Sequence, residues 1–340
     1  MMKALKLILR VLLTAALVGA LLHFVDWQKV AGALARARLG WMVAAFLLVI
    51  VGRAVQAGQL TLILRFVGST VSWFRVFRAG ALGAFYAQIT PGGVASAVAK
   101  WTDLSAATQN RSRVANAILY HRILLDLQPL LIGAAALAWS NPTGEPILAI
   151  ATGGLAALGL AGAIALYSRR LPVPLVRLAE AASHRLPGAA GRGVGRLLHD
   201  LDAFRGFTMT RHLSAAGVGL LAFGFRVAAR LCLIRALGFS VPLTTIIWVD
   251  ALLIVAFHLP ITLSNFGVRE GLVIAAFGLH GIPADVAFAY GLLIYACQLP
   301  MSLVGGTYQL ALIAGWAKMK DETVVQGDSA VLGESAGGAR

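Results

Sequence analysis

Residues 147–167 form a continuous apolar run that contains no charged side chain. A helix needs roughly 20 mostly apolar residues to cross the hydrocarbon core of a bilayer, so this run is long enough to span one. Similar runs recur at 41–51, 129–139, 213–225 and 284–317. Charged residues make up only 13% of the chain. Soluble domains carry about 25%. Because the alternation typical of membrane strands is absent, we expect an all-α, polytopic transmembrane helical bundle.

The chain is expected to form one multi-span domain, residues 1–317, followed by a disordered tail rich in Gly and Ser, residues 318–340. We place spans at about 5–25, 41–64, 114–140, 147–167 and 213–237, with further apolar segments at 243–260, 266–281 and 284–317. The first span follows three basic residues and lacks a clear cleavage site, so we interpret it as an uncleaved transmembrane helix.

The formal net charge is +15, and many of the basic residues lie in the polar segment 168–212. Basic loops stay on the cytoplasmic side, so this segment is expected there, in the inner (plasma) membrane of a bacterial-type cell. Its apolar residues recur at helical spacing, which favours basic amphipathic helices on the membrane surface over a plain loop. The chain has no zinc-finger spacing and no aromatic–basic RNA motif, so no nucleic-acid partner is expected.

Two regions, 79–101 and 256–274, are apolar at both ends and interrupted in the middle by Pro, Gly, Ser, Thr or Asn. Each is expected to be a broken or re-entrant helical segment rather than an ordinary span. A hairpin at 79–99 that enters and leaves from the inside keeps most basic residues of the N-terminal part cytoplasmic, which a full crossing does not. A simple proline kink in a spanning helix is the alternative.

An internal repeat is indicated by similar motifs in the same order. Residues 62–69 resemble 231–240, and residues 85–90 resemble 257–262. In the expected topology the copies are inverted, a pattern typical of transporters, with the site at the broken helices. Chance similarity of short apolar motifs is the alternative.

The first break is expected to bind substrate. Its candidate residues are Gln88, Thr90, Pro91, Gly92 and Gly93. Proline and glycine free main-chain groups, and a half-helix that starts after the glycines directs its positive end at an anionic group. Beyond the break, Lys100 and Trp101 fit a position at the membrane interface.

The second break contains the candidates Asn265, Gly267, Arg269 and Glu270. Arginine forms paired hydrogen bonds to oxyanions, so Arg269 is expected to meet a lipid phosphate. Glu270 is open to three roles: an internal ion pair, a proton relay, or a contact with a cationic head group. A loop at the membrane surface, with both charges in water, is the alternative.

Arg122 and Asp126 lie four residues apart, on one helix face, and complete the set of candidates. Other polar residues in apolar segments are Arg53, Gln56, Gln59, His121, Arg226, Arg230, Asp250 and His258. Each alone is typical of a structural hydrogen bond between helices. Together they are too many for lipid-facing positions, so an internal polar cavity is expected.

The motif GVREG at 267–271, the preceding LPITLSN, PGG at 91–93 and RILLDL at 122–127 resemble the lysylphosphatidylglycerol synthase transmembrane-region family, also described as flippase-like. The resemblance covers about 5–317 and implies a lipid-translocating domain with broken helices at its centre. It implies functional roles for Gly267, Arg269, Glu270, Pro91, Gly92, Gly93 and Arg122. Family members often have an acidic residue after the double Gly and an Arg three residues later. This chain has Val94 and Ala97 there, with Lys100 the nearest basic residue.

We therefore expect a lipid flippase or transporter whose partner is a membrane phospholipid with an anionic or zwitterionic head group. No nucleotide-binding or metal-binding motif is visible, so no cofactor, metal or enzymatic activity is expected. No soluble aminoacyl-transferase domain follows residue 317, so lysyl transfer is not expected either. A transporter or channel for a small hydrophilic solute, and an intramembrane lipid-modifying enzyme, are the competing functions. A homo-oligomer is left open.

Overall fold

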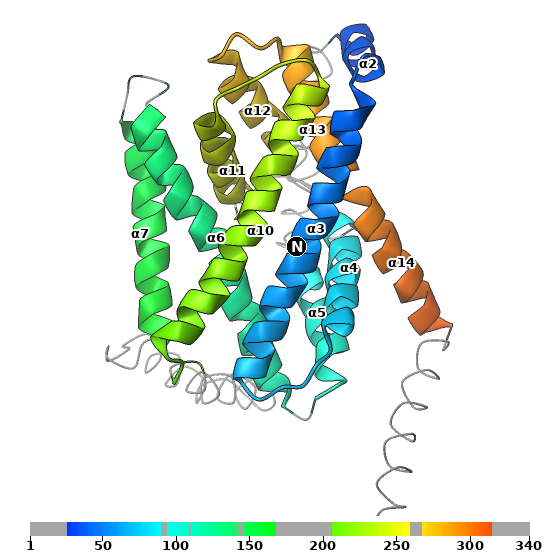
Figure 1. Cartoon of the computed structure of the whole chain (residues 1–340), viewed down its shortest axis with the longest axis vertical. Helices are drawn as coiled ribbons and strands as arrows, with labels where there is room; N and C mark the ends of the chain where they lie inside the picture. The colour runs from blue at the N-terminus through cyan, green and yellow to red at the C-terminus, as the bar shows by residue number, and fades with distance from the viewer. Residues whose placement is uncertain are drawn as a thin grey trace, which may run out of the picture.

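The computed structural model describes residues 26–89, 94–108, 110–140, 146–167, 206–258 and 267–314, together with 142, 144 and 204. Every regular element in these residues is a helix, which confirms the all-α class (Figure 1). The expected first span at 5–25, most of the basic segment 168–212 and the tail 318–340 lie outside the described residues.

The first half of the chain contributes α2 (Trp27–Ala35), α3 (Leu39–Phe66), α4 (Trp73–Ile89), α5 (Val94–Ser105), α6 (Arg111–Ser140) and α7 (Ile147–Tyr167). The second half contributes α10 (Met209–Ala236), α11 (Leu243–His258), α12 (Val268–Gly278), α13 (Ala284–Ala296) and α14 (Leu299–Ile313). By length and composition α3, α6, α7, α10 and the run Ala284–Ile313 can each cross a membrane. The spans expected in these regions are confirmed, except that the last one is broken between α13 and α14.

The two halves repeat the same order of elements. Helices α3 and α10 each have 28 residues, and each ends at a glycine with positive φ, 78° at Gly68 and 85° at Gly238. In both, the N–H three positions past the last helical residue donates to a carbonyl five residues back, from Ser69 to Leu64 and from Phe239 to Ile234. These are matching Schellman ends, for which glycine is favoured because it adopts positive φ without a steric penalty.

The repeats are inverted. In Figure 1 the chain descends along α3 and rises along α10, and these two helices pack side by side. The main packing partners also correspond, since α4 packs on α14 in the way that α11 packs on α6. Pro129 lies inside α6, and Pro300 lies in the first turn of α14, so the α13–α14 break and the proline of α6 occupy equivalent places.

The two broken regions are pairs of half-helices. Both α4 and α5 lie in the lower half of Figure 1, and both α11 and α12 lie in the upper half. At 1.5 Å per residue α5 and α12 are about 18 and 16 Å long, too short for a hydrocarbon core of roughly 30 Å. Helices α4 and α5 also pack on each other, as the hairpin interpretation of 79–99 requires, and entry and exit from the same side of the membrane stay a prediction. The turns themselves, 90–93 and 259–266, lie outside the described residues.

Two apolar clusters hold the ends of the bundle. One joins α10, α11, α12 and α13 at the end that carries α2, with Phe277, Phe288 and Tyr290 fully buried. The other lies at the opposite end and includes the aromatic residues Tyr120 and Phe204. Polar side chains are concentrated between these clusters.

Candidate functional site

Four basic side chains from four helices converge between the two apolar clusters. They are Arg53 of α3, Lys100 of α5, Arg122 of α6 and Arg226 of α10, and we call them the cationic centre. Arg53 lies close enough to Arg226 and Arg122 for their positive charges to repel it. Lys100 lies close enough to Arg53 and Arg122 for the same effect. Arg53 lies midway along the 28-residue α3, so the centre is deep within the expected membrane layer.

Only part of this positive charge is neutralised. Arg122 forms an ion pair of 2.5 Å with Asp126, and Arg226 pairs at 2.8 Å with Asp250. Across the described ranges, no carboxylate forms an ion pair with Arg53 or Lys100. The charged side chains that repel each of them are also cations. Cations held away from bulk water without a counter-charge are costly, so the centre favours an anion.

The centre is open on the side of α6. The Arg122 side chain is 61% exposed, whereas Asp126 is 21% exposed, so the arginine is accessible from this side. Arginine presents several donors in a planar fork that matches the oxygens of a phosphate. The arrangement can therefore bind an oxyanion that approaches from this opening.

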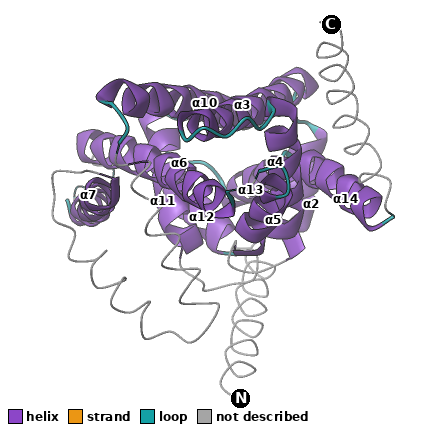
Figure 2. Cartoon of the chain, turned by 90° about the horizontal axis from the view of Figure 1, so that it is seen from below, coloured by secondary structure: helices purple, strands orange, loops and turns teal. Residues whose placement is uncertain are grey.

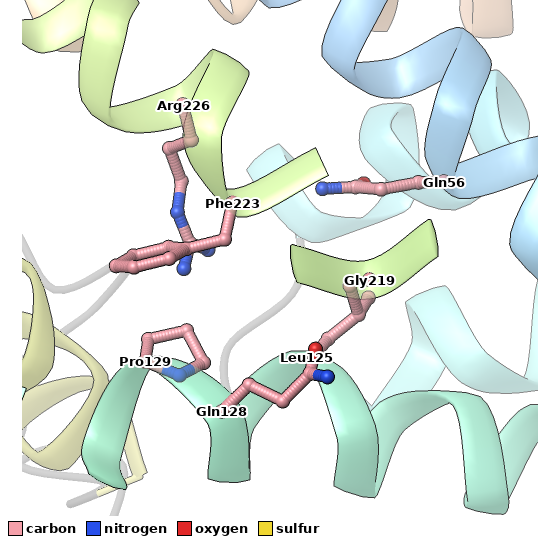
Figure 3. A pocket seen from close by; sticks show the side chains of 7 residues that line it. All are labelled: Gln56, Leu125, Gln128, Pro129, Gly219, Phe223 and Arg226. Atoms are coloured by element: carbon pink, nitrogen blue, oxygen red, sulfur yellow. The ribbon is translucent and has the colours of Figure 1, made fainter. Parts of the chain in front are cut away.

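A narrow hollow, too small to admit a water molecule, adjoins the centre between α3, α6 and α10 (Figure 3). Gln56, Arg226 and Gln128 extend toward it from these three helices, and Phe223 lies under the Arg226 guanidinium. Its lining residues are Gln56, Leu125, Gln128, Pro129, Gly219, Phe223 and Arg226. The polar side chains of this lining therefore lie next to Arg226 of the cationic centre.

Two glutamines fix α10 against its neighbours beside this hollow. Gln59 donates to the carbonyl of Ala215 at 2.9 Å, and Gln128 donates to the carbonyl of Ala216 at 2.7 Å. A Cβ at Gly219 would displace the ends of both glutamine side chains from their present positions. Gln59 therefore makes the kind of structural hydrogen bond between helices that is typical of a lone polar residue in an apolar segment.

The candidates Gly267, Arg269 and Glu270 form a compact buried unit. Glu270 accepts the N–H of Gly267 at 2.8 Å and the Arg269 guanidinium at 2.9 and 2.5 Å. The exposed fractions of Arg269 and Glu270 are 5% and 0%. Arg269 also lies over the ring of Tyr295, and Glu270 packs against Gly291 of α13. Among the three roles considered for Glu270, these contacts show the internal ion pair, and a binding role for the unit stays a prediction.

The other candidates divide into two groups. Arg122 and Asp126 lie at the cationic centre, and Gln88 lies in the last turn of α4. Thr90, Pro91, Gly92, Gly93 and Asn265 lie outside the described residues, so their role and the meeting of the two breaks stay predictions.

The expectation that Lys100 lies at the membrane interface is wrong. Its side chain packs against Gly83 of α4, where a Cβ would overlap it, and is acted on by the charges of Arg53 and Arg122. The glycine at 83 in α4 is a sequence signal for this inward position, because it leaves room for a long side chain on the facing half-helix.

The family model described as the lysylphosphatidylglycerol synthase TM region matches residues 7–305. The match takes in the described helices from α2 to α13 and the first part of α14. Comparison with curated proteins and with solved structures gave no match.

Proposed function

Since this chain belongs to the lysylphosphatidylglycerol synthase TM region family of membrane proteins involved in lipid handling, we propose that it moves a phospholipid between the two leaflets. The polar head group passes through the cationic centre while the acyl chains stay in the bilayer. This is transport without bond making or breaking, in the inner (plasma) membrane.

The observation that carries the proposal is that Arg53 and Lys100 lie near other cations, while no carboxylate in the described ranges forms an ion pair with either. A phosphate group crossing the hydrocarbon layer alone loses its hydration, which is the main barrier to spontaneous movement. Charge-assisted hydrogen bonds from arginine and lysine replace that hydration, and the phosphate in turn neutralises the two cations. The half-helices on both sides of the centre shorten the distance over which the head group leaves water.

The test is translocation of fluorescently labelled phosphatidylglycerol and phosphatidylethanolamine in vesicles that contain the purified protein. The fluorescence of labels in the outer leaflet is removed by a reductant that does not cross the membrane. We expect Arg53→Gln and Lys100→Gln each to slow translocation about tenfold, the effect of losing one hydrogen bond to a charged group. Arg65→Gln removes an exposed arginine from the end of the same α3 and is expected to leave the rate unchanged.

A wild-type protein that moves no labelled lipid would contradict the proposal. So would unchanged rates in both centre variants, provided that each elutes as a single folded species. The competing function, transport of a small hydrophilic solute, is measured in the same vesicles with radioactive phosphate. Phosphate uptake that depends on Arg53, with no lipid movement, would favour that alternative.

A further inference from the structure

A groove separates the α4–α5 hairpin from the second half of α14. The two sides meet closely at one place, where Gly305 of α14 leaves no room for a Cβ against the Ala81 carbonyl, and Ser302 donates to the carbonyl of Ala84 at 3.3 Å. Beyond this crossing α14 diverges from the bundle, as Figures 1 and 2 show. The groove occupies the resulting gap and has an empty volume of about 1090 Å³, its open side included.

The walls of the groove are mostly apolar. Leu82 of α4, Val98 of α5 and Leu312 of α14 contribute to the lining. On the outer side of α14, Leu310 is 67% exposed and Leu303 is 69% exposed, so this helix faces lipid. A groove that opens sideways toward a lipid-facing helix is accessible from the bilayer, and a hydrocarbon chain fits walls of this kind.

A polar cluster closes the groove at the end where α5 ends. The Tyr308 hydroxyl donates to Asp103 Oδ1 at 2.8 Å, and Arg75 donates to the Asp103 main-chain carbonyl at 3.1 Å. Arg78 lies over the ring of Tyr308, 4.3 Å from its centre. The cluster therefore brings two guanidinium groups and one carboxylate to the level of the membrane at which lipid head groups are expected.

In the described part of the chain, Asp103 Oδ2 and Arg78 Nε are both buried side-chain atoms of this cluster without a hydrogen-bond partner. Asp103 is only 9% exposed, and its Oδ2 accepts no hydrogen bond in the described part of the chain. A buried carboxylate oxygen without a donor is unfavourable, so a ligand donor that meets Oδ2 when the Asp103 side chain turns toward the groove gains free energy. Arg75 and Asp103 both line the groove, so a single head group can reach the two side chains.

We propose that this groove receives a phospholipid from the adjacent leaflet, selected for a head group that bears a hydrogen-bond donor. Arg75 binds the phosphate, Asp103 Oδ2 accepts the donor, and an acyl chain lies along Leu82, Val98 and Leu312. The donor is the ammonium of phosphatidylethanolamine or a hydroxyl of phosphatidylglycerol. The choline group has neither, so phosphatidylcholine is disfavoured. The inference rests on the proposed function, for which the groove is the lateral entrance.

The experiment places the unmodified protein in lipid nanodiscs with phospholipids that carry a photoreactive acyl chain, and maps the adducts by peptide mass spectrometry. Four probes differ only in head group: phosphatidylethanolamine, phosphatidylglycerol, phosphatidylcholine and diacylglycerol. Adducts on α7, whose Leu158 is 72% exposed, report unselective contact with the bilayer and serve as the reference in the same sample.

Relative to α7, adducts of a donor-bearing phospholipid on α4, α5 and α14 should exceed those of phosphatidylcholine and diacylglycerol about threefold, within the range of one net hydrogen bond. Selectivity for one of the two donor-bearing lipids identifies the donor as ammonium or hydroxyl. Asp103→Asn, which retains an acceptor for Tyr308, should abolish discrimination against phosphatidylcholine. Arg75→Gln should abolish discrimination against diacylglycerol.

Equal labelling of the groove by all four probes in the wild-type protein would overturn the inference, and this comparison needs no variant. The assay measures occupancy and not movement between leaflets. A protein that labels selectively but moves no lipid therefore contradicts the proposed function and leaves the groove site standing. A protein that moves lipid but labels without selectivity contradicts only the groove.

Discussion

Glu270 accepts two hydrogen bonds from Arg269, the residue that precedes it in α12. Successive residues of a helix usually point in different directions. Here both lie in the first turn, and Glu270 turns back to accept the N–H of Gly267, which brings its carboxylate within reach of the guanidinium. The charges of this motif cancel each other, whereas in the described part of the chain no carboxylate forms an ion pair with Arg53 or Lys100.

Breaking this pair should destabilise the protein. Glu270→Ala leaves Arg269 buried without its counter-charge, and we expect a loss of about 3–5 kcal/mol in unfolding free energy. The double variant Arg269→Met, Glu270→Gln removes both charges and should recover part of the loss. Thermal unfolding in detergent measures the difference. An unchanged unfolding temperature for Glu270→Ala, or a double variant less stable than both single ones, would contradict the structural role.

Asp250 and Asp126 should differ strongly in their effect on stability. Asp250 is 1% exposed and pairs with both Arg226 and Arg230, so Asp250→Asn should cost about 3–5 kcal/mol. Asp126 pairs with a largely exposed arginine, so Asp126→Asn is the matched control, with an expected cost below about 1 kcal/mol. Chemical unfolding of the two variants in the same detergent checks the order. Equal losses would show that burial does not set the strength of these pairs.

The crossing of α4 and α14 should tolerate no side chain at Gly305. A Cβ at this position overlaps the Ala81 carbonyl, so Gly305→Ala forces the helices apart at a cost of about 1–3 kcal/mol. Gly153→Ala on α7 places the same methyl group in open space and should be neutral or stabilising by up to about 1 kcal/mol. Unfolding temperatures of both variants test the prediction, and a stable Gly305→Ala would place α14 elsewhere.

The inverted repeat makes a prediction about sidedness. Thr70 precedes the first hairpin, Ala107 follows it, and Ser240 precedes the second hairpin at the position equivalent to Thr70. With Cys232 and Cys297 replaced by alanine, single cysteines at 70 and 107 should react with an impermeant maleimide from one side only, and a cysteine at 240 from the other. Labelling of 70 and 107 from opposite sides would mean that the first hairpin crosses the membrane.

Much of the architecture could be predicted from local sequence. The run 147–167 predicts a span because its length matches the bilayer and it contains no charge. The arginine and glycine at 65 and 68 recur at 235 and 238, and these glycines occupy the positive-φ ends of α3 and α10. The break between α13 and α14 was not predicted, because both helices are apolar. A proline in the first turn of a helix does not by itself distinguish a break from a continuous apolar span.

The sequence by itself determined that this chain is a helical membrane protein, and it indicated two related halves and two interrupted regions. These properties depend on composition and spacing, which are local. Only the tertiary structure decided which charges meet. Lys100 turns inward and joins Arg53, Arg122 and Arg226, while Glu270 is satisfied by Arg269. Ionic contacts depend on distances of a few ångströms between separate helices, and those distances are set only when the helices pack.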